Sequence, residues 1–187
     1  ADFTFNSVIV GKGANSVAGN TVLGETALDA SVSGGNNTAI GKNALTTLTS
    51  GTKNSALGSG ALQLNTTGDF NTALGSLTLD ANTTGANNTA CGEGSLSANT
   101  TASNNTAVGY QALEENTTGT ENVAVGAIAL TAATTASYNT GIGRYALGNT
   151  TTGGSNTGVG HNVLKENTTG TQNVAVGGSA LDANTTG

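Results

Sequence analysis

One phrase of the sequence, an asparagine followed by a short apolar run and a glycine, recurs at a fixed distance along almost the whole chain. The glycine that closes it returns every 17 residues in ten copies, without insertion or deletion, from Gly24 to Gly177. Such a period is typical of repeat architectures, in which each unit packs only against its neighbours. We therefore expect one elongated unit rather than a globule, although 187 residues would otherwise suit one or two domains.

Alignment of the units, counted from their asparagine, separates constant places from variable ones. The ninth place is always leucine, the fourth is Leu, Ile, Val or Cys, and the third is Ala or Gly in every copy after the first. We predict that ninth-place and fourth-place side chains form the structural core, with these members: Ile40, Leu45, Leu57, Leu62, Val108, Leu113, Val125, Leu130, Val159 and Leu164. We predict that the third-place row is a close-packing interface, too tight for larger side chains: Ala39, Ala56, Ala73, Ala90, Ala107, Ala124, Gly141, Gly158 and Ala175.

The composition favours strands over helices. Proline, which would remove a hydrogen-bond donor from an interior strand, is absent, and 29 glycines suit tight corners. The Asn-Thr-Thr-Gly segments, such as residues 116–119, are poor helix formers and interrupt any helical spacing of apolar residues. A 17-residue coil, about 55 Å long if extended, has room for two short strands and two turns. The sequence predicts an all-β fold, a parallel β-solenoid or β-roll of about ten coils over residues 21–187, preceded by an irregular first coil or cap over residues 1–20.

A single roll of this kind has a small core. Aromatic residues make up only 3% of the chain, and each coil offers about two large aliphatic side chains to offset the entropy of ordering 17 residues. Burial of the third-place row against neighbouring chains would supply further contact. We therefore expect a homotrimer, and a monomeric mass in solution would refute that expectation.

Two phrases carry a resemblance to a known family: "NTAVGYQAL" at residues 105–113 and "NVAVGGSAL" at residues 173–181. They resemble the repeats of YadA-like heads in trimeric autotransporter adhesins and the shaft repeats of phage tail fibres. The likeness covers residues 20–187, with a period longer than that of the typical head repeat. It implies a left-handed parallel β-roll, three chains about one axis, no enzymatic activity, and a role in attachment outside the cell, on a virion tail fibre or a bacterial surface.

No constellation in the sequence points to catalysis, a metal or a cofactor. Charged side chains occupy variable places of the unit, and the only adjacent carboxylates, Glu114 and Glu115, would point to opposite faces of a strand. His161 is the single histidine, and Cys91, the single cysteine, replaces an aliphatic residue at the fourth place. We expect no enzyme, no catalytic or metal-ligating residue, and no bound cofactor.

The charge and the aromatic residues narrow the partners. A formal net charge of −6 with five cationic side chains argues against a nucleic-acid partner, and no apolar run approaches the 18 residues of a membrane span. We expect a host-surface receptor instead, for example a glycan. The candidate receptor contacts are the aromatic residues at variable places of the unit, although partial burial between chains would explain them nearly as well: Phe70, Tyr110, Tyr138 and Tyr145.

Three functions therefore stay open. The first is the shaft or head of a trimeric attachment fibre, and the second is a subunit of a self-assembled extracellular filament. The third is an ice-binding or ligand-binding solenoid, for which the recurring Thr-Thr pairs supply regular rows. Because adjacent threonines point to opposite faces of a strand, these pairs argue against a flat plane.

Overall fold

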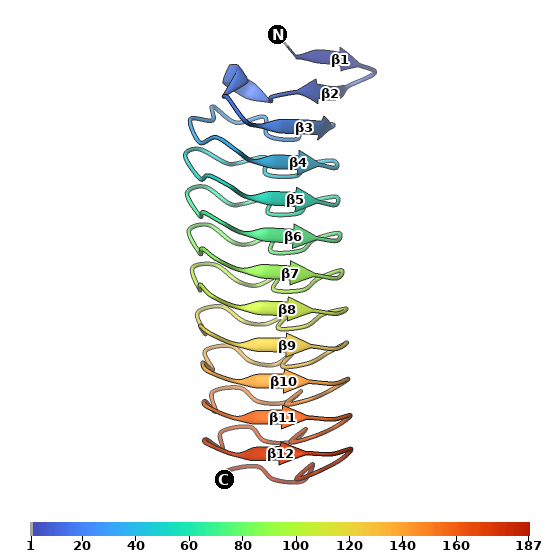
Figure 1. Cartoon of the computed structure of the whole chain (residues 1–187), viewed down its shortest axis with the longest axis vertical. Helices are drawn as coiled ribbons and strands as arrows, with labels where there is room; N and C mark the ends of the chain where they lie inside the picture. The colour runs from blue at the N-terminus through green and yellow to red at the C-terminus, as the bar shows by residue number, and fades with distance from the viewer. Residues whose placement is uncertain (1) are drawn as a thin grey trace.

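The computed structural model describes residues 2–187, which wind into a β-solenoid in the shape of an elongated rod (Figure 1). Each regular coil contributes one short strand, and the strands pair in parallel in sequence order. The strands of the coils are β3 (Thr21–Gly24), β4 (Thr38–Ile40), β5 (Ser55–Leu57), β6 (Thr72–Leu74), β7 (Thr89–Cys91), β8 (Thr106–Val108), β9 (Val123–Val125), β10 (Thr140–Ile142), β11 (Thr157–Val159) and β12 (Val174–Val176). The predicted all-β parallel solenoid is confirmed.

The register of the sheet reproduces the sequence period without a slip. Ala107 of β8 pairs with Ala90 of β7 on one side and with Ala124 of β9 on the other, and every neighbouring pair of coils repeats this pattern. Equivalent places of the unit therefore stack in columns along the rod. A residue's neighbours across the sheet are the residues 17 positions before and after it.

An antiparallel hairpin covers the N-terminal end of the stack. Strand β1 (Phe3–Phe5) pairs with β2 (Val8–Gly11), and β2 pairs in turn with β3. A short 3-10 helix, η1 (Ala14–Ser16), links the hairpin to the first coil. Figure 1 shows this hairpin at the blue end of the rod, with β1 outermost.

The core is a narrow column inside the coils. Ninth-place leucines are fully buried along the rod, including the predicted Leu45, Leu62, Leu113, Leu130 and Leu164, until Leu181 in the last coil. Third-place and eighth-place residues, mostly alanine, pack around them in the same cluster. These leucines therefore occupy one repeated slot of the core.

Each coil holds one strand rather than the two that its length would allow. The return segment bends because, besides the glycine after the strand, three other places of the unit take positive φ, as at Gln111 (+53°), Leu113 (+53°) and Glu121 (+58°). Left-handed residues break the extended backbone and turn the chain around a small core. A glycine forms the corner after each strand from β4 to β12. After β8 this glycine is Gly109, which has a φ of +137°, and a Cβ on it would lie 2.6 Å from the carbonyl of Gly126 in the next coil.

Two rows of buried asparagine replace further apolar core. First-place asparagines bridge coils: the Oδ1 of Asn88 accepts the backbone N–H of Asn105 at 3.0 Å, and the Nδ2 of Asn105 donates to the carbonyl of Gly119 at 2.8 Å. Twelfth-place asparagines form a second ladder, in which the Nδ2 of Asn99 donates to the Oδ1 of Asn82 at 2.8 Å. These amides pair the buried polar groups at the corners, which would otherwise be costly.

Candidate functional site

The outer surface of the strands is the most unusual face of the rod. Successive side chains of a strand point to opposite sides, so in each three-residue strand the third-place residue points inward while the second and fourth places point outward. The fourth-place side chains are accordingly half-buried or exposed; that of Leu57 is 47% exposed. A long aliphatic row thus faces solvent in the single chain.

This row continues without interruption onto the N-terminal hairpin. Phe3 pairs with Val10, and Val10 pairs with Leu23, so these three side chains share one side of the sheet with the fourth-place row. We call the whole row the aliphatic stripe; its members are Phe3, Val10, Leu23, Ile40, Leu57, Leu74, Cys91, Val108, Val125, Ile142, Val159 and Val176. At about 4.8 Å per strand the stripe is roughly 50 Å long.

The structure exchanges the roles that the sequence predicts for the third and fourth places. The fourth-place residues predicted for the core lie outside it, on the stripe: Ile40, Leu57, Val108, Val125 and Val159. Alternation along a strand allows only one of two adjacent residues to face inward, and the third-place row takes the inner side.

The third-place residues predicted to pack between chains are buried inside their own chain, with Ala39, Ala90, Ala107 and Ala124 at 0% exposure. Their small size has an intrachain cause. A Cβ built on Gly141 would lie 3.4 Å from Cδ1 of Leu130, and one on Gly158 would lie 3.1 Å from Cγ1 of Val163. The core leucines and valines lie directly behind the strand, so only Ala or Gly fits well.

A second column runs beside the stripe on the same face. We call it the threonine column; it consists of the second-place residues Thr21, Thr38, Ser55, Thr72, Thr89, Thr106, Val123, Thr140, Thr157 and Val174. Over β4–β6 a shallow groove of about 260 Å³ lies along both columns, with Ile40, Leu57 and Leu74 among its lining residues. Neither column contains a charged residue. The strand face therefore combines apolar and hydroxyl groups.

The four aromatic residues predicted to contact a receptor are not brought together. Phe70 and Tyr138 lie at the seventeenth place, before the strands, whereas Tyr110 and Tyr145 lie at the sixth and seventh places, after them. The Nζ of Lys53 lies 4.7 Å from the centroid of the Phe70 ring, and the Cζ of Arg144 lies 4.4 Å from the centroid of the Tyr145 ring. Tyr110, half-exposed, borders a hollow on the return side of the coil.

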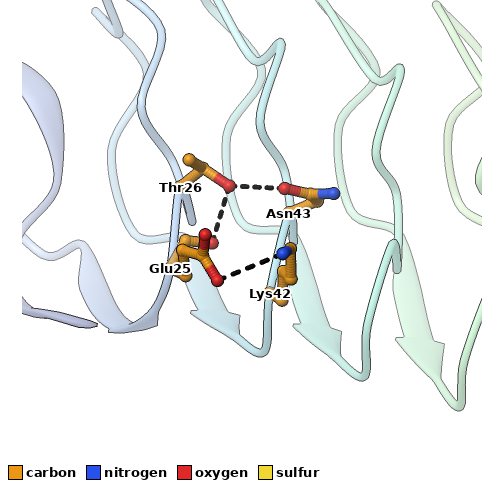
Figure 2. A network of polar contacts seen from close by, with 4 residues as sticks. All are labelled: Glu25, Thr26, Lys42 and Asn43. Carbon is orange, nitrogen blue, oxygen red and sulfur yellow. Dashed lines mark hydrogen bonds and ion pairs between the residues drawn. The ribbon is translucent and has the colours of Figure 1, made fainter. Parts of the chain in front are cut away.

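Polar contacts between neighbouring coils follow the corner after the strands. Figure 2 shows one such network, in which the Nζ of Lys42 lies 3.1 Å from the Oε2 of Glu25, and the Oγ1 of Thr26 donates to the carbonyl of Glu25 and contacts the Oδ1 of Asn43. Both members of the ion pair are about half-exposed, so solvent screens their attraction and the pair contributes little to stability. This network supports the corner and has no feature of a ligand site.

The remaining candidates are a metal cluster, a membrane-spanning helix and the single cysteine. Within residues 2–187 no group of three or more His, Cys, Asp and Glu side chains is placed to hold a metal ion, and no helix is long and apolar enough to cross a bilayer. Cys91 is a free thiol on the aliphatic stripe rather than in the core. No protein-family model, curated protein or solved structure matches the chain.

Proposed function

We propose that the chain is one protomer of a homotrimeric extracellular fibre that attaches a virion or a bacterial cell to a host or another surface. In this assembly the three strand faces turn toward a common axis and the return segments face outward. The aliphatic stripe is the observation that carries the proposal, because a continuous apolar row of this length on a soluble rod is typical of an interaction surface.

The stripe offers enough apolar surface for association. A fully buried aliphatic side chain contributes about 1.5–3 kcal/mol, so covering a half-exposed one contributes roughly 1 kcal/mol. The ten aliphatic residues of the stripe, together with Phe3 and Cys91, would give on the order of 10 kcal/mol per protomer. This gain is comparable with the 4–15 kcal/mol or more that association costs. The stripe, and not the third-place row, is therefore the surface on which the trimer proposal rests.

The distribution of charge also supports a closed assembly. In a cyclic oligomer each residue close to the axis meets its own copies, so a charged residue there would face like charges. The strand face from Thr21 to Val176 has none, although the chain has 16 acidic, lysine and arginine side chains in total. Those of the coils lie at the corners and on the return segments, where a fibre would meet solvent and a receptor.

A second candidate function, ice binding, is favoured by the threonine column on the same face. The recurring Thr-Thr pairs are less suitable, because their first members use the hydroxyl within the chain; the Oγ1 of Thr66 donates to the carbonyl of Thr83 at 3.0 Å. The second-place threonines are on the open sheet instead. Because ice binding needs this face uncovered, the two proposals exclude each other.

The first test is the mass of the purified chain by multi-angle light scattering. We expect about 54 kDa, three times the 18.0 kDa of one chain. Leu57→Asp should reduce the mass to that of one chain, since each copy would carry a buried charge to the axis. Leu64→Asp is the matched control, because Leu64 is 46% exposed, against 47% for Leu57, but does not belong to the stripe.

A mass of 18.0 kDa for the unmodified chain at micromolar concentration would overturn the trimer. Thermal hysteresis of that monomer would then favour ice binding, and open-ended polymers would favour the filament. Electron microscopy of the intact fibre should show three chains about one axis and a rod joined to a larger particle. Rods with no such attachment would contradict the attachment role.

A further inference from the structure

A hollow of about 260 Å³ lies on the return side of the coils, beyond the carboxyl ends of the strands. It forms where the seventh place of the unit is occupied by Gly94, between Leu77 of the preceding coil and Gln111 of the following one. The column thus has a side chain above and below the hollow but none at its centre.

The hollow has one aromatic and one aliphatic wall. Tyr110 is 50% exposed and Leu77 is 48% exposed, and they belong to coils on either side of the coil of Gly94. The face of a tyrosine ring carries negative partial charge and attracts weakly positive groups, C–H groups among them. A flat ring with C–H groups on one side and polar groups at its rim fits this wall.

The remaining lining is rich in hydrogen-bond acceptors. Asp80, Glu93 and Glu114 contribute carboxylates, and no lysine, arginine or histidine lines the hollow. Gln111 holds one of these groups in place, because its Nε2 donates to the Oε1 of Glu114 at 2.8 Å. Ionised carboxylates only accept hydrogen bonds, so a ligand here must bring donors.

Asp80 shows most directly that a donor is missing. Its Oδ1 is buried and finds no hydrogen-bond partner in the described chain. Burial raises the pKa of the Asp80 carboxyl above its ordinary value, against the opposing effect of the backbone N–H groups of Asp80 and Ala81. A buried acceptor without a donor is costly, so the chain itself leaves this carboxylate in the wall of the hollow unsatisfied.

We propose that this hollow binds one uncharged pyranose ring of a surface glycan, with its C–H face against Tyr110 and its hydroxyl groups donating to Asp80, Glu93 and Glu114. A volume just below that of drug-sized pockets suits a single ring. Acidic sugars are repelled by the three carboxylates, and within residues 2–187 these groups are not arranged to hold a metal ion that would bridge them. The inference builds on the proposed attachment function, for which it names the class of receptor.

The test is saturation-transfer NMR on the purified chain with three uncharged probes and one anionic probe. The uncharged probes are methyl glucoside, methyl galactoside and methyl mannoside, and the anionic probe is N-acetylneuraminic acid. We expect saturation of at least one uncharged glycoside, strongest at the protons of one ring face, and none of the anionic sugar. No transfer to any of the three glycosides, or stronger transfer to the anionic sugar, would overturn the inference.

The chain supplies a matched pair of variants that fill the same place of the unit. Gly94→Gln should reduce the signal at least tenfold, because the new side chain fills the hollow. The coil tolerates this side chain, since Gln111 occupies the seventh place with a similar φ and a Cβ on Gly94 would lie 3.5 Å from the Cγ of Gln111, an ordinary contact. Asn162→Gln, at the same place of the unit four coils after Gly94, introduces the same side chain away from the hollow and should leave the signal unchanged. Equal loss in both variants, or none in Gly94→Gln, would contradict the assignment.

Tyr110→Ala should abolish the signal, whereas Tyr138→Ala, which removes an exposed ring at the seventeenth place, should preserve it. The result is separable from the fate of the trimer. An assembly of about 54 kDa that transfers saturation to none of the glycosides would overturn only the glycan-binding proposal. A monomer that transfers saturation to one of them would overturn only the trimer proposal.

Discussion

Replacing Ala133 with asparagine should stabilise the folded chain, because Ala133 interrupts a ladder of buried amides. On one side, the Nδ2 of Asn116 donates to the Oδ1 of Asn99 at 3.1 Å, but the Oδ1 of Asn116 faces the next coil without a donor. On the other side of Ala133, the Oγ1 of Thr150 also has no partner in the described chain. Asn116, Ala133 and Thr150 are all fully buried.

An asparagine at residue 133 would serve both neighbours. Its amide N–H could donate to the Oδ1 of Asn116, and its own Oδ1 could accept from the hydroxyl of Thr150. The local backbone is compatible with this side chain, because Asn99 and Ala102 already form the same combination in the coil of β7. There the Nδ2 of Asn99 also donates to the carbonyl of Ala102 at 3.1 Å. Ala133→Asn with Ala136 recreates that arrangement two coils later.

The expected gain follows from the cost of a buried polar atom without a partner, about 1–3 kcal/mol. Ordering the new side chain offsets up to about 1 kcal/mol of it. A net gain of roughly 1–2 kcal/mol in a chain of this size raises Tm by about 2–8 °C. Thermal unfolding followed by circular dichroism, at one fixed protein concentration because assembly would shift Tm, measures the change.

Two further variants check the cause of the change. Ala133→Asp introduces a side chain of nearly the same shape as asparagine but without the amide donor. At neutral pH it should lower Tm, because it places a carboxylate beside the Oδ1 of Asn116. Asn99→Ala should also lower Tm, since the Oδ1 of Asn82 loses its donor. If Ala133→Asn unfolds at or below the Tm of the unmodified chain, the unpaired amide oxygen does not limit stability, and the reasoning fails.

Two more predictions concern the return segments. Asp80→Asn should raise Tm at pH 7, because burial destabilises the charged carboxyl of Asp80. Burial raises the pKa of Asp80 in the folded chain, so the folded state loses stability as the pH rises above the ordinary pKa of 3.8. The gain in Tm should vanish below that pH, where the carboxyl is protonated in both the folded and the unfolded chain. Asp29→Asn, at the same place of the unit but exposed, is the control, and an equal effect in both variants would contradict the role of burial. Ile128→Asn should raise the free energy of unfolding by roughly 1 kcal/mol in urea titrations, because Ile128 has a φ of +60° and asparagine tolerates this region better; a clear loss would show that its apolar contacts outweigh the backbone strain.

The repeat itself was readable from the sequence because its period is exact and its ninth-place leucine is invariant. In a stack of identical coils, residues 17 apart must be neighbours, so the parallel register and the buried column at Leu45, Leu62 and Leu113 follow from the period alone. The asparagines and glycines at constant places likewise mark the corners. No alternative register would keep these columns intact.

The sequence by itself also placed the charges at the corners, but it could not decide which of two adjacent apolar rows faces inward. Ala107 and Val108 are both apolar, and the direction of their side chains depends on where the strand begins and on left-handed residues such as Leu113, whose φ runs against the preference of leucine. Only the complete path of the coil determines which of the two rows faces the core.

The hollow was equally beyond reach from sequence alone. Its only trace in the sequence is a glycine at the seventh place of the unit, Gly94, and the same glycine recurs at Gly60, where it does not line the hollow. The hollow arises because stacking brings Leu77, Gly94 and Tyr110 from three successive coils to one place. The sequence determined the columns, whereas the tertiary structure decided which columns are inside, which are outside, and where a missing side chain leaves space, because these depend on how the chain turns between strands.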